Sequence, residues 1–257
     1  SLETGLKSII FQTVIDSKFW EYPNGAEEID LKPDGLDNLM GTPATEALQN
    51  NLNQIAEDSP TDLYFVVSVA DKDYILEPED VYGGYPNNWM TMGQYRGPYE
   101  ELGYQHVIWI EIRPSGENYD INDLNPNELA KKISTTINHE LVHYEQLKKQ
   151  AENKGLSDID AYREMVHDKK QVTTSDDREV YLTRHGEIDA YAHEAAEQLV
   201  DTYGAKKALE VARKLLPVDI GKYPEISSVV LDYAEVLKDN PEKLNKFRKK
   251  LYQQIQK

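Results

Sequence analysis

The segment ISTTINHELVHYEQ, residues 133 to 146, carries two of the six histidines of the chain, His139 and His143, with Glu140 next to the first. It lies within NPNELAKKISTTINHELVHYEQLKKQA, residues 125 to 151. Asn125 and Pro126 form a typical helix start, because Asn caps free amides and Pro suits the first turn. No breaker follows until Gly155. The sequence therefore predicts one long helix.

Two faces of this helix differ in chemistry. Residues four positions apart on an α-helix lie nearly above one another, so His139 and His143 project from one side. An apolar stripe on a different side is formed by Ile133, Ile137, Leu141 and Tyr144. That stripe can anchor the helix in a core without the histidines. We therefore expect the histidines to face a cleft.

The histidine pair and Glu140 have the chemistry of a hydrolytic metal site. Neutral imidazoles bind a divalent ion without cancelling its charge, and a neighbouring carboxylate can take a proton from water. The segment TTINHELVHYEQ resembles the active-site helix of the zincin metallopeptidases, in which an HExxH motif supplies two zinc ligands and the catalytic glutamate. The resemblance implies Zn²⁺ bound by His139 and His143, with Glu140 as general base. The metzincin extension is absent, because Gln146 and Lys149 stand at its positions.

A third ligand has to come from another segment, because a catalytic zinc commonly has three protein ligands and an open position. The stretch EIDAYA, residues 187 to 192, resembles the downstream helix of gluzincin-like peptidases. That resemblance implies Glu187 as the third ligand, with His185, His193 and Glu194 as alternatives. Tyr191 stands where thermolysin-like enzymes carry an acid, so Asp189 or Glu194 could orient a histidine instead. The candidates for stabilising the oxyanion are Tyr191, Tyr181, Arg184 and His185, and the sequence does not decide among them. Tyr191 is included with Glu140 among the predicted catalytic residues.

The remaining segments predict an α+β protein with a zincin-like fold: a small mixed sheet, a long active-site helix and a helical C-terminal half. Strands are expected at LYFVVSVA, 63–70, and HVIWIEIRP, 106–114, and helices at 4–20 and 42–59. Loops are predicted at residues 23–41, 79–105 and 169–180. Helices are expected at 157–168, at 185–204 and through the rest of the chain. We predict a single catalytic unit, 1–257, with an N-terminal lobe at 1–151 and a C-terminal lobe at 152–257.

Composition limits the possible partners. The net charge of −18, from 46 acidic and 28 basic residues, disfavours nucleic acid and anionic lipid. The chain has no cysteine, which excludes disulfides and thiolate ligands to zinc. No apolar run is long enough for membrane insertion. The chain shows no signal peptide, so we expect a cytoplasmic rather than a secreted protein; the sequence does not indicate an oligomeric state.

The expected function is zinc-dependent hydrolysis of peptide bonds in a peptide or protein substrate. The resemblance to zincins implies that the edge of HVIWIEIRP receives an extended peptide by strand addition. The alternative is a zincin-like binding or assembly protein whose metal is structural or lost and which has no turnover.

Overall fold

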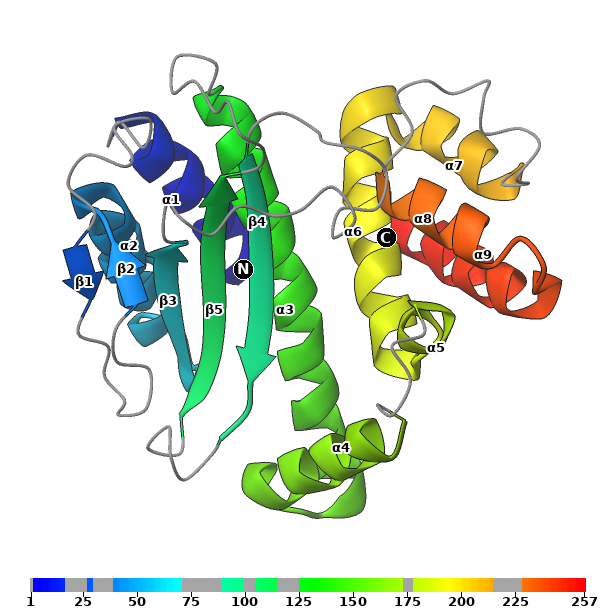
Figure 1. The fold of residues 1–257 in the computed structure, drawn as a ribbon, viewed down its shortest axis with the longest axis horizontal. Helices are drawn as coiled ribbons and strands as arrows, with labels where there is room; N and C mark the ends of the chain where they lie inside the picture. The colour runs from blue at the N-terminus through cyan, green and yellow to red at the C-terminus, as the bar shows by residue number, and fades with distance from the viewer. Residues whose placement is uncertain are drawn as a thin grey trace. The chain divides into compact units, whose positions relative to one another are not determined.

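The computed structural model describes residues 2–16, 27–29, 39–70, 89–98, 105–114, 125–172, 178–214 and 228–257. The chain divides into two compact units, Ser1–Tyr162 and Arg163–Lys257 (Figure 1). The boundary between them falls within helix α4 (Asp158–Val172).

A mixed three-stranded sheet forms the centre of the first unit. Its middle strand is β5 (His106–Pro114), which pairs in parallel with β3 (Leu63–Val69) and antiparallel with β4 (Trp89–Arg96). The small mixed sheet is therefore confirmed, and so are the strands expected at β3 and β5. The loop predicted for residues 79–105 was wrong where β4 runs. Gly93 and Gln94 hide the strand, since neither residue type favours the β conformation.

The predicted role of β5 as an edge strand was wrong. Partners on both sides use its backbone groups, from His106 paired with Leu63 to Pro114 paired with Trp89. Within the described residues, β4 is instead an edge of this sheet, because its recorded pairing is with β5 alone. An added strand would find its backbone partners at an edge strand such as β4 and not at β5.

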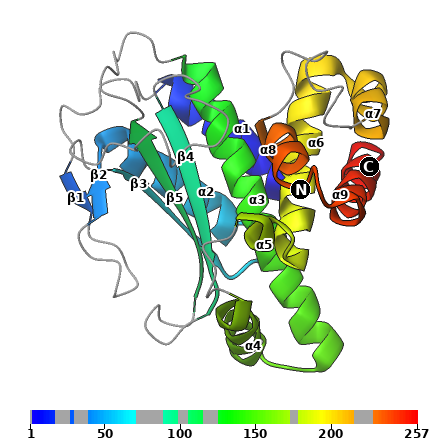
Figure 2. The ribbon, with the colours of Figure 1, turned by 45° about the vertical axis from the view of Figure 1, so that its right-hand side comes forward.

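Three helices pack beside the sheet in the first unit (Figure 2). Helix α2 (Pro43–Glu57) contacts β3, and α3 (Pro126–Lys154) contacts β4 and β5. Helix α1 (Leu2–Asp16) packs against both α2 and α3. Buried residues of this core include Ile10, Leu48, Phe65, Ile108, Ile110 and Ile133. The sheet therefore provides a fixed support for one face of α3.

A two-stranded antiparallel sheet, β1 (Glu27–Ile29) with β2 (Leu39–Gly41), also belongs to this unit. The prediction that residues 23–41 are all loop was therefore wrong at these short strands. Their three residues each are too few for a periodic signal to stand out among turn-forming neighbours.

The second unit is helical. After α4 it contains α5 (Arg178–Leu182), α6 (His185–Tyr203), α7 (Ala205–Arg213), α8 (Ser228–Val236) and α9 (Pro241–Ile255). Helix α6 packs against α7, α8 and α9 around a core that includes Tyr233 and Phe247, whose rings stack at 3.9 Å. The loop predicted for 169–180 was wrong at both ends, where α4 continues to Val172 and α5 begins at Arg178.

The structure confirms the α+β class, with a small sheet and a predominance of helices. No helix in the described part of the chain has the length and the apolar character that a membrane crossing requires.

Candidate metal centre

Helix α3 carries the predicted motif and is capped as expected. The Asn125 side chain accepts hydrogen bonds from the amides of Asn127 and Glu128, and Pro126 occupies the first turn. The helix ends at Gly155, whose left-handed backbone, with φ of 63°, suits glycine. Between these caps it runs for 29 residues. The long central helix is therefore confirmed.

The two histidines lie on one side of α3, as their spacing predicts. Their ring centroids are 5.1 Å apart, and the exposed fractions of His139 and His143 are only 7% and 6%. His143 Nδ1 lies 3.3 Å from Gln146 Oε1. Two imidazoles on one tetrahedral zinc have ligand nitrogens about 3.4 Å apart, given bonds of about 2.1 Å. The spacing of the rings is compatible with that arrangement, so the donor set of the pair fits a zinc ion.

The apolar stripe of α3 is confirmed in part. Ile133, Ile137 and Leu141 are buried. Tyr144 differs, because it is only partly buried and its hydroxyl donates a hydrogen bond of 2.7 Å to Asp62 Oδ1. It belongs to a polar contact that the sequence pattern did not reveal.

Glu140 is buried beside the histidines and held by strand β4. Its Oε2 accepts a hydrogen bond of 2.6 Å from the backbone amide of Tyr95. One turn earlier on α3, the hydroxyl of Thr136 lies 2.8 Å from that of Thr91 on β4. A buried carboxylate requires such a partner, because its desolvation is otherwise unfavourable. The amide fixes one carboxylate oxygen and thereby the direction of the other.

Gly93 gives Glu140 its space. An added β-carbon at position 93 would lie 2.7 Å from Glu140 Oε1 and 2.7 Å from Thr136 Cγ2. Real β-carbons do not approach other atoms so closely, so a side chain here would displace the carboxylate. The contacts of Gly93 and Tyr95 with Glu140 were not predicted, because both residues lie in the segment predicted as a loop, 79–105.

Glu187 lies in the second unit, in the first turn of α6, and is buried. The Tyr181 hydroxyl donates a hydrogen bond of 3.2 Å to Glu187 Oε2, and the hydroxyl of Tyr191 lies 3.4 Å from that of Tyr181. Arg184 stacks over the Tyr181 ring at 5.3 Å. Three of the four residues considered for the oxyanion, Tyr181, Arg184 and Tyr191, therefore gather with Glu187. The fourth, His185, has a side chain outside the described residues.

The other acids of α6 have different contacts. Asp189 Oδ1 lies 2.9 Å from the ammonium of Lys250 on α9, an ion pair within the second unit. Glu194 accepts a hydrogen bond of 3.2 Å from the Gln198 amide. His193, the remaining alternative ligand, is partly buried on the same helix. Glu187 instead accepts a hydrogen bond from a tyrosine hydroxyl, which orients one of its carboxylate oxygens.

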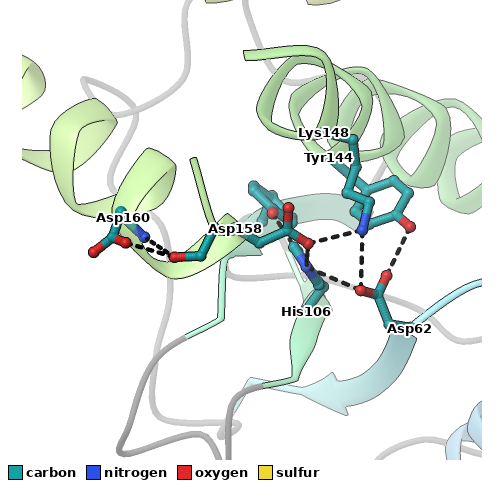
Figure 3. A network of polar contacts seen from close by, with 8 residues as sticks. Asp62, His106, Tyr144, Lys148, Asp158 and Asp160 are labelled. Atoms are coloured by element: carbon teal, nitrogen blue, oxygen red, sulfur yellow. Dashed lines mark hydrogen bonds and ion pairs between the residues drawn. The ribbon is translucent and has the colours of Figure 1, made fainter. Parts of the chain in front are cut away.

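A second polar cluster in the first unit was not predicted (Figure 3). Ligand atoms of Asp62, His106 and Asp158 all lie within 4.8 Å of one another, a set that could hold a metal ion. The ammonium of Lys148, however, lies 2.7 Å from Asp158 Oδ2 and 3.2 Å from Asp62 Oδ2. The lysine supplies positive charge at this place. We therefore interpret the cluster as an ion-pair network in which Lys148 takes the place that a metal ion could occupy.

The pKa shifts in this network agree with its contacts. Burial lowers the pKa of His106, and the neighbouring Asp62 and Asp158 oppose that effect without cancelling it. Burial alone would raise the pKa of Asp62 and lower that of Lys148. The hydrogen bonds and charges that these two groups share with the network reverse both effects, so the pKa of Asp62 is lowered and that of Lys148 is raised. The network therefore contains a neutral imidazole, an anionic Asp62 and a cationic Lys148 at neutral pH.

Comparisons with protein-family models, with curated proteins and with solved structures find no match to this chain.

Proposed function

We propose that the protein is a zinc-dependent metallopeptidase of the gluzincin type. His139, His143 and Glu187 are three residues whose side chains can bind a divalent ion. Glu140 is the proposed general base, and Tyr191 the proposed donor to the oxyanion. The observation that supports the proposal most is Glu140 itself: a buried carboxylate, held at 2.6 Å by a backbone amide and adjacent in sequence to a buried pair of imidazoles.

Each of these residues has a defined task. A zinc ion held by this set would polarise a carbonyl group and lower the pKa of water. Glu140 accepts a proton from the attacking water and delivers it to the leaving amine, which requires a carboxylate with a fixed direction. Tyr181 orients Glu187 through the hydroxyl hydrogen bond. Tyr191 is a phenol within reach of the same group and can donate to the developing oxyanion.

An extended peptide substrate suits the edge that β4 forms among the described strands. The Tyr95 amide points to Glu140 and not to β5. In an antiparallel pair this direction recurs at every second residue, so the amides of Gly93 and Thr91 point the same way. We propose that the peptide pairs with this edge by strand addition, next to Glu140.

Metal content and hydrolysis of a peptide library by the full chain test the proposal. We expect about one zinc per chain, and loss of zinc in His139→Ala, His143→Ala and Glu187→Ala. Glu140→Gln should keep the zinc and lower kcat by about 10²- to 10⁴-fold. Glu145→Gln, an exposed acid on the same helix, is the matched control and should retain full activity. Zinc binding without turnover on any substrate would instead favour the alternative of a binding or assembly protein.

A further inference from the structure

One face of α3 is polar along its length and lies against the sheet. Thr136 meets Thr91, with hydroxyls 2.8 Å apart, and one turn later Glu140 accepts from the Tyr95 amide. Tyr144 and Lys148, four and eight residues after Glu140, contact the carboxylates of the network around His106. The face therefore consists of residues at intervals of four, Thr136, Glu140, Tyr144 and Lys148.

Tyr95 connects Glu140 to the network through its two ends. Its backbone amide donates to Glu140, while its hydroxyl lies 2.6 Å from His106 Nδ1 on the adjacent strand β5. The two rings are nearly parallel, at 17° and 6.0 Å between centroids. Both residues are buried, and His106 has an exposed fraction of 1%. The ring that contacts His106 and the amide that binds Glu140 belong to one residue, so a contact that fixes the ring also restrains the backbone of β4 at this point.

His106 leads back to α3 by its other nitrogen. Its Nε2 lies 3.1 Å from Asp158 Oδ2 and 3.3 Å from Asp62 Oδ2 (Figure 3). Lys148 forms ion pairs with both carboxylates, and the Tyr144 hydroxyl donates to Asp62. The contacts thus form a closed path that starts and ends on one face of the same helix.

The directions of these hydrogen bonds are consistent around the path. Burial raises the pKa of the Tyr95 phenol, so its hydroxyl keeps the proton and donates to His106 Nδ1. A neutral imidazole that accepts at Nδ1 carries its proton on Nε2, which then donates to Asp158. Replacing His106 with an apolar side chain would leave the buried Tyr95 hydroxyl without this acceptor. Such a loss is unfavourable, and Tyr95 would move to find another partner.

We infer that His106 is a positioning residue for Glu140: through the Tyr95 hydroxyl it holds β4 where the Tyr95 amide binds the Glu140 carboxylate. The catalytic consequence of this inference depends on the proposed peptidase function, but the positioning itself does not. His106 is separated from Glu140 by Tyr95, so the role inferred for it is positioning.

The first experiment measures the Tyr95 amide by NMR in the full chain labelled with ¹⁵N-tyrosine. Its signal is the one that disappears in Tyr95→Phe. An amide that donates strongly to a carboxylate resonates at low field, and Glu140→Gln should move it upfield. His106→Leu should move it in the same direction. His106→Asn, which removes the ring but offers a polar atom at the place of Nδ1, should leave it closer to the wild-type position and controls for the ring current.

A second variant covers the case in which His106→Leu does not fold. In Tyr95→Phe the phenol is absent while the amide remains, and ¹⁵N-phenylalanine labelling reports it as one new signal beside those of the four native phenylalanines. We expect this signal upfield of the wild-type Tyr95 amide. Ser68→Ala, which removes the acceptor for the Trp109 indole on the other face of the sheet, is the matched control and should shift neither signal. Unchanged amide positions in both His106→Leu and Tyr95→Phe would overturn the inference.

Kinetics then separate this inference from the proposed function. If the protein hydrolyses peptides, His106→Leu and Tyr95→Phe should lower kcat by about tenfold with KM and zinc content unchanged, a pattern expected when only a group acting in the transition state is misplaced. Lost zinc in these variants would contradict a positioning role and indicate general unfolding. If the wild-type protein hydrolyses nothing, the proposed function fails, while the amide shifts still decide whether His106 positions Glu140.

Discussion

Gly93 on β4 and Glu140 on α3 approach each other so closely that position 93 has no room for a side chain. A β-carbon there would lie 2.7 Å from Glu140 Oε1 and 2.8 Å from Glu140 Cγ. The backbone conformation does not require glycine at this position, since Gly93 is not among the glycines with positive φ. The close approach to the carboxylate is therefore what restricts this position to glycine.

The first prediction is that Gly93→Ala displaces Glu140. The added methyl group should lower the free energy of unfolding by about 1–3 kcal/mol, the usual effect of overpacking, and should weaken the Tyr95–Glu140 hydrogen bond. Urea denaturation measures the first effect and the Tyr95 amide signal the second. Gly5→Ala is the matched control, because its nearest neighbour, Ile55 Cγ2, is 3.5 Å away and its site is helical. The control should be neutral or stabilising, and an equal loss in both variants would contradict the prediction.

The second prediction concerns the partner of Glu187. Tyr181→Phe removes the hydroxyl that donates to Glu187 Oε2. If Glu187 is a zinc ligand, the loss of this orienting hydrogen bond should weaken zinc binding by about tenfold. Competition with a chelator of known affinity measures the change. Tyr252→Phe, whose hydroxyl accepts from the exposed Arg213, is the control. Unchanged zinc affinity in Tyr181→Phe would argue against Glu187 as a ligand.

How far the sequence predicted the candidate site depended on the range of the interactions. The cap at Asn125, the length of α3 and the common side of His139 and His143 follow from contacts within a few residues, and these predictions were confirmed. Tyr181, Arg184 and Glu187 also lie within one short stretch of chain, although the sequence did not predict that Glu187 is buried. Local periodicity and capping chemistry suffice for such features.

Strand β4 and the His106 network could not be predicted in the same way. The face of β4 toward α3 consists of Thr91, Gly93 and Tyr95, which meet a polar helix face, so the strand lacks the apolar alternation that identifies most strands. Asp158 lies 52 residues from His106 along the chain. No local pattern connects such distant residues, and only the fold, with α3 packed on the sheet and Asp158 close after the end of α3, brings them together.

The third prediction is a pH dependence that originates at His106. Its pKa is lowered in the folded protein from an ordinary value of 6.5. As the pH falls below about 6.5 the unfolded chain binds a proton at this residue that the folded protein does not, so the free energy of unfolding decreases until the lowered pKa is reached. The decrease is at most about 1.4 kcal/mol per pH unit for one such group. Lys148 remains charged and Asp62 remains ionised in this range, because their pKa shifts favour those forms.

His106→Asn tests this dependence. Urea denaturation of the wild-type protein and the variant between pH 7.5 and pH 5 should show a shallower decrease in the variant, which cannot bind a proton at this position. The other five histidines are common to both proteins and cancel in the comparison. Parallel curves for the two proteins would show that His106 does not contribute to the acid sensitivity.

The fourth prediction concerns the support of the turn before α6. Tyr233 is fully buried, stacks on Phe247 and donates a hydrogen bond of 2.8 Å to the carbonyl of Leu182, just before the start of α6. Tyr233→Phe keeps the ring and removes only this donor, which should lower the free energy of unfolding by about 1–3 kcal/mol, as for other buried acceptors left without a partner. Tyr252→Phe again provides the control. The Tyr252 hydroxyl accepts from the exposed Arg213, so this substitution should lower the free energy of unfolding by less than about 0.5 kcal/mol. Equal losses in the two variants would mean that the buried hydroxyl contributes no more than an exposed one, and that the stacked rings alone hold this turn.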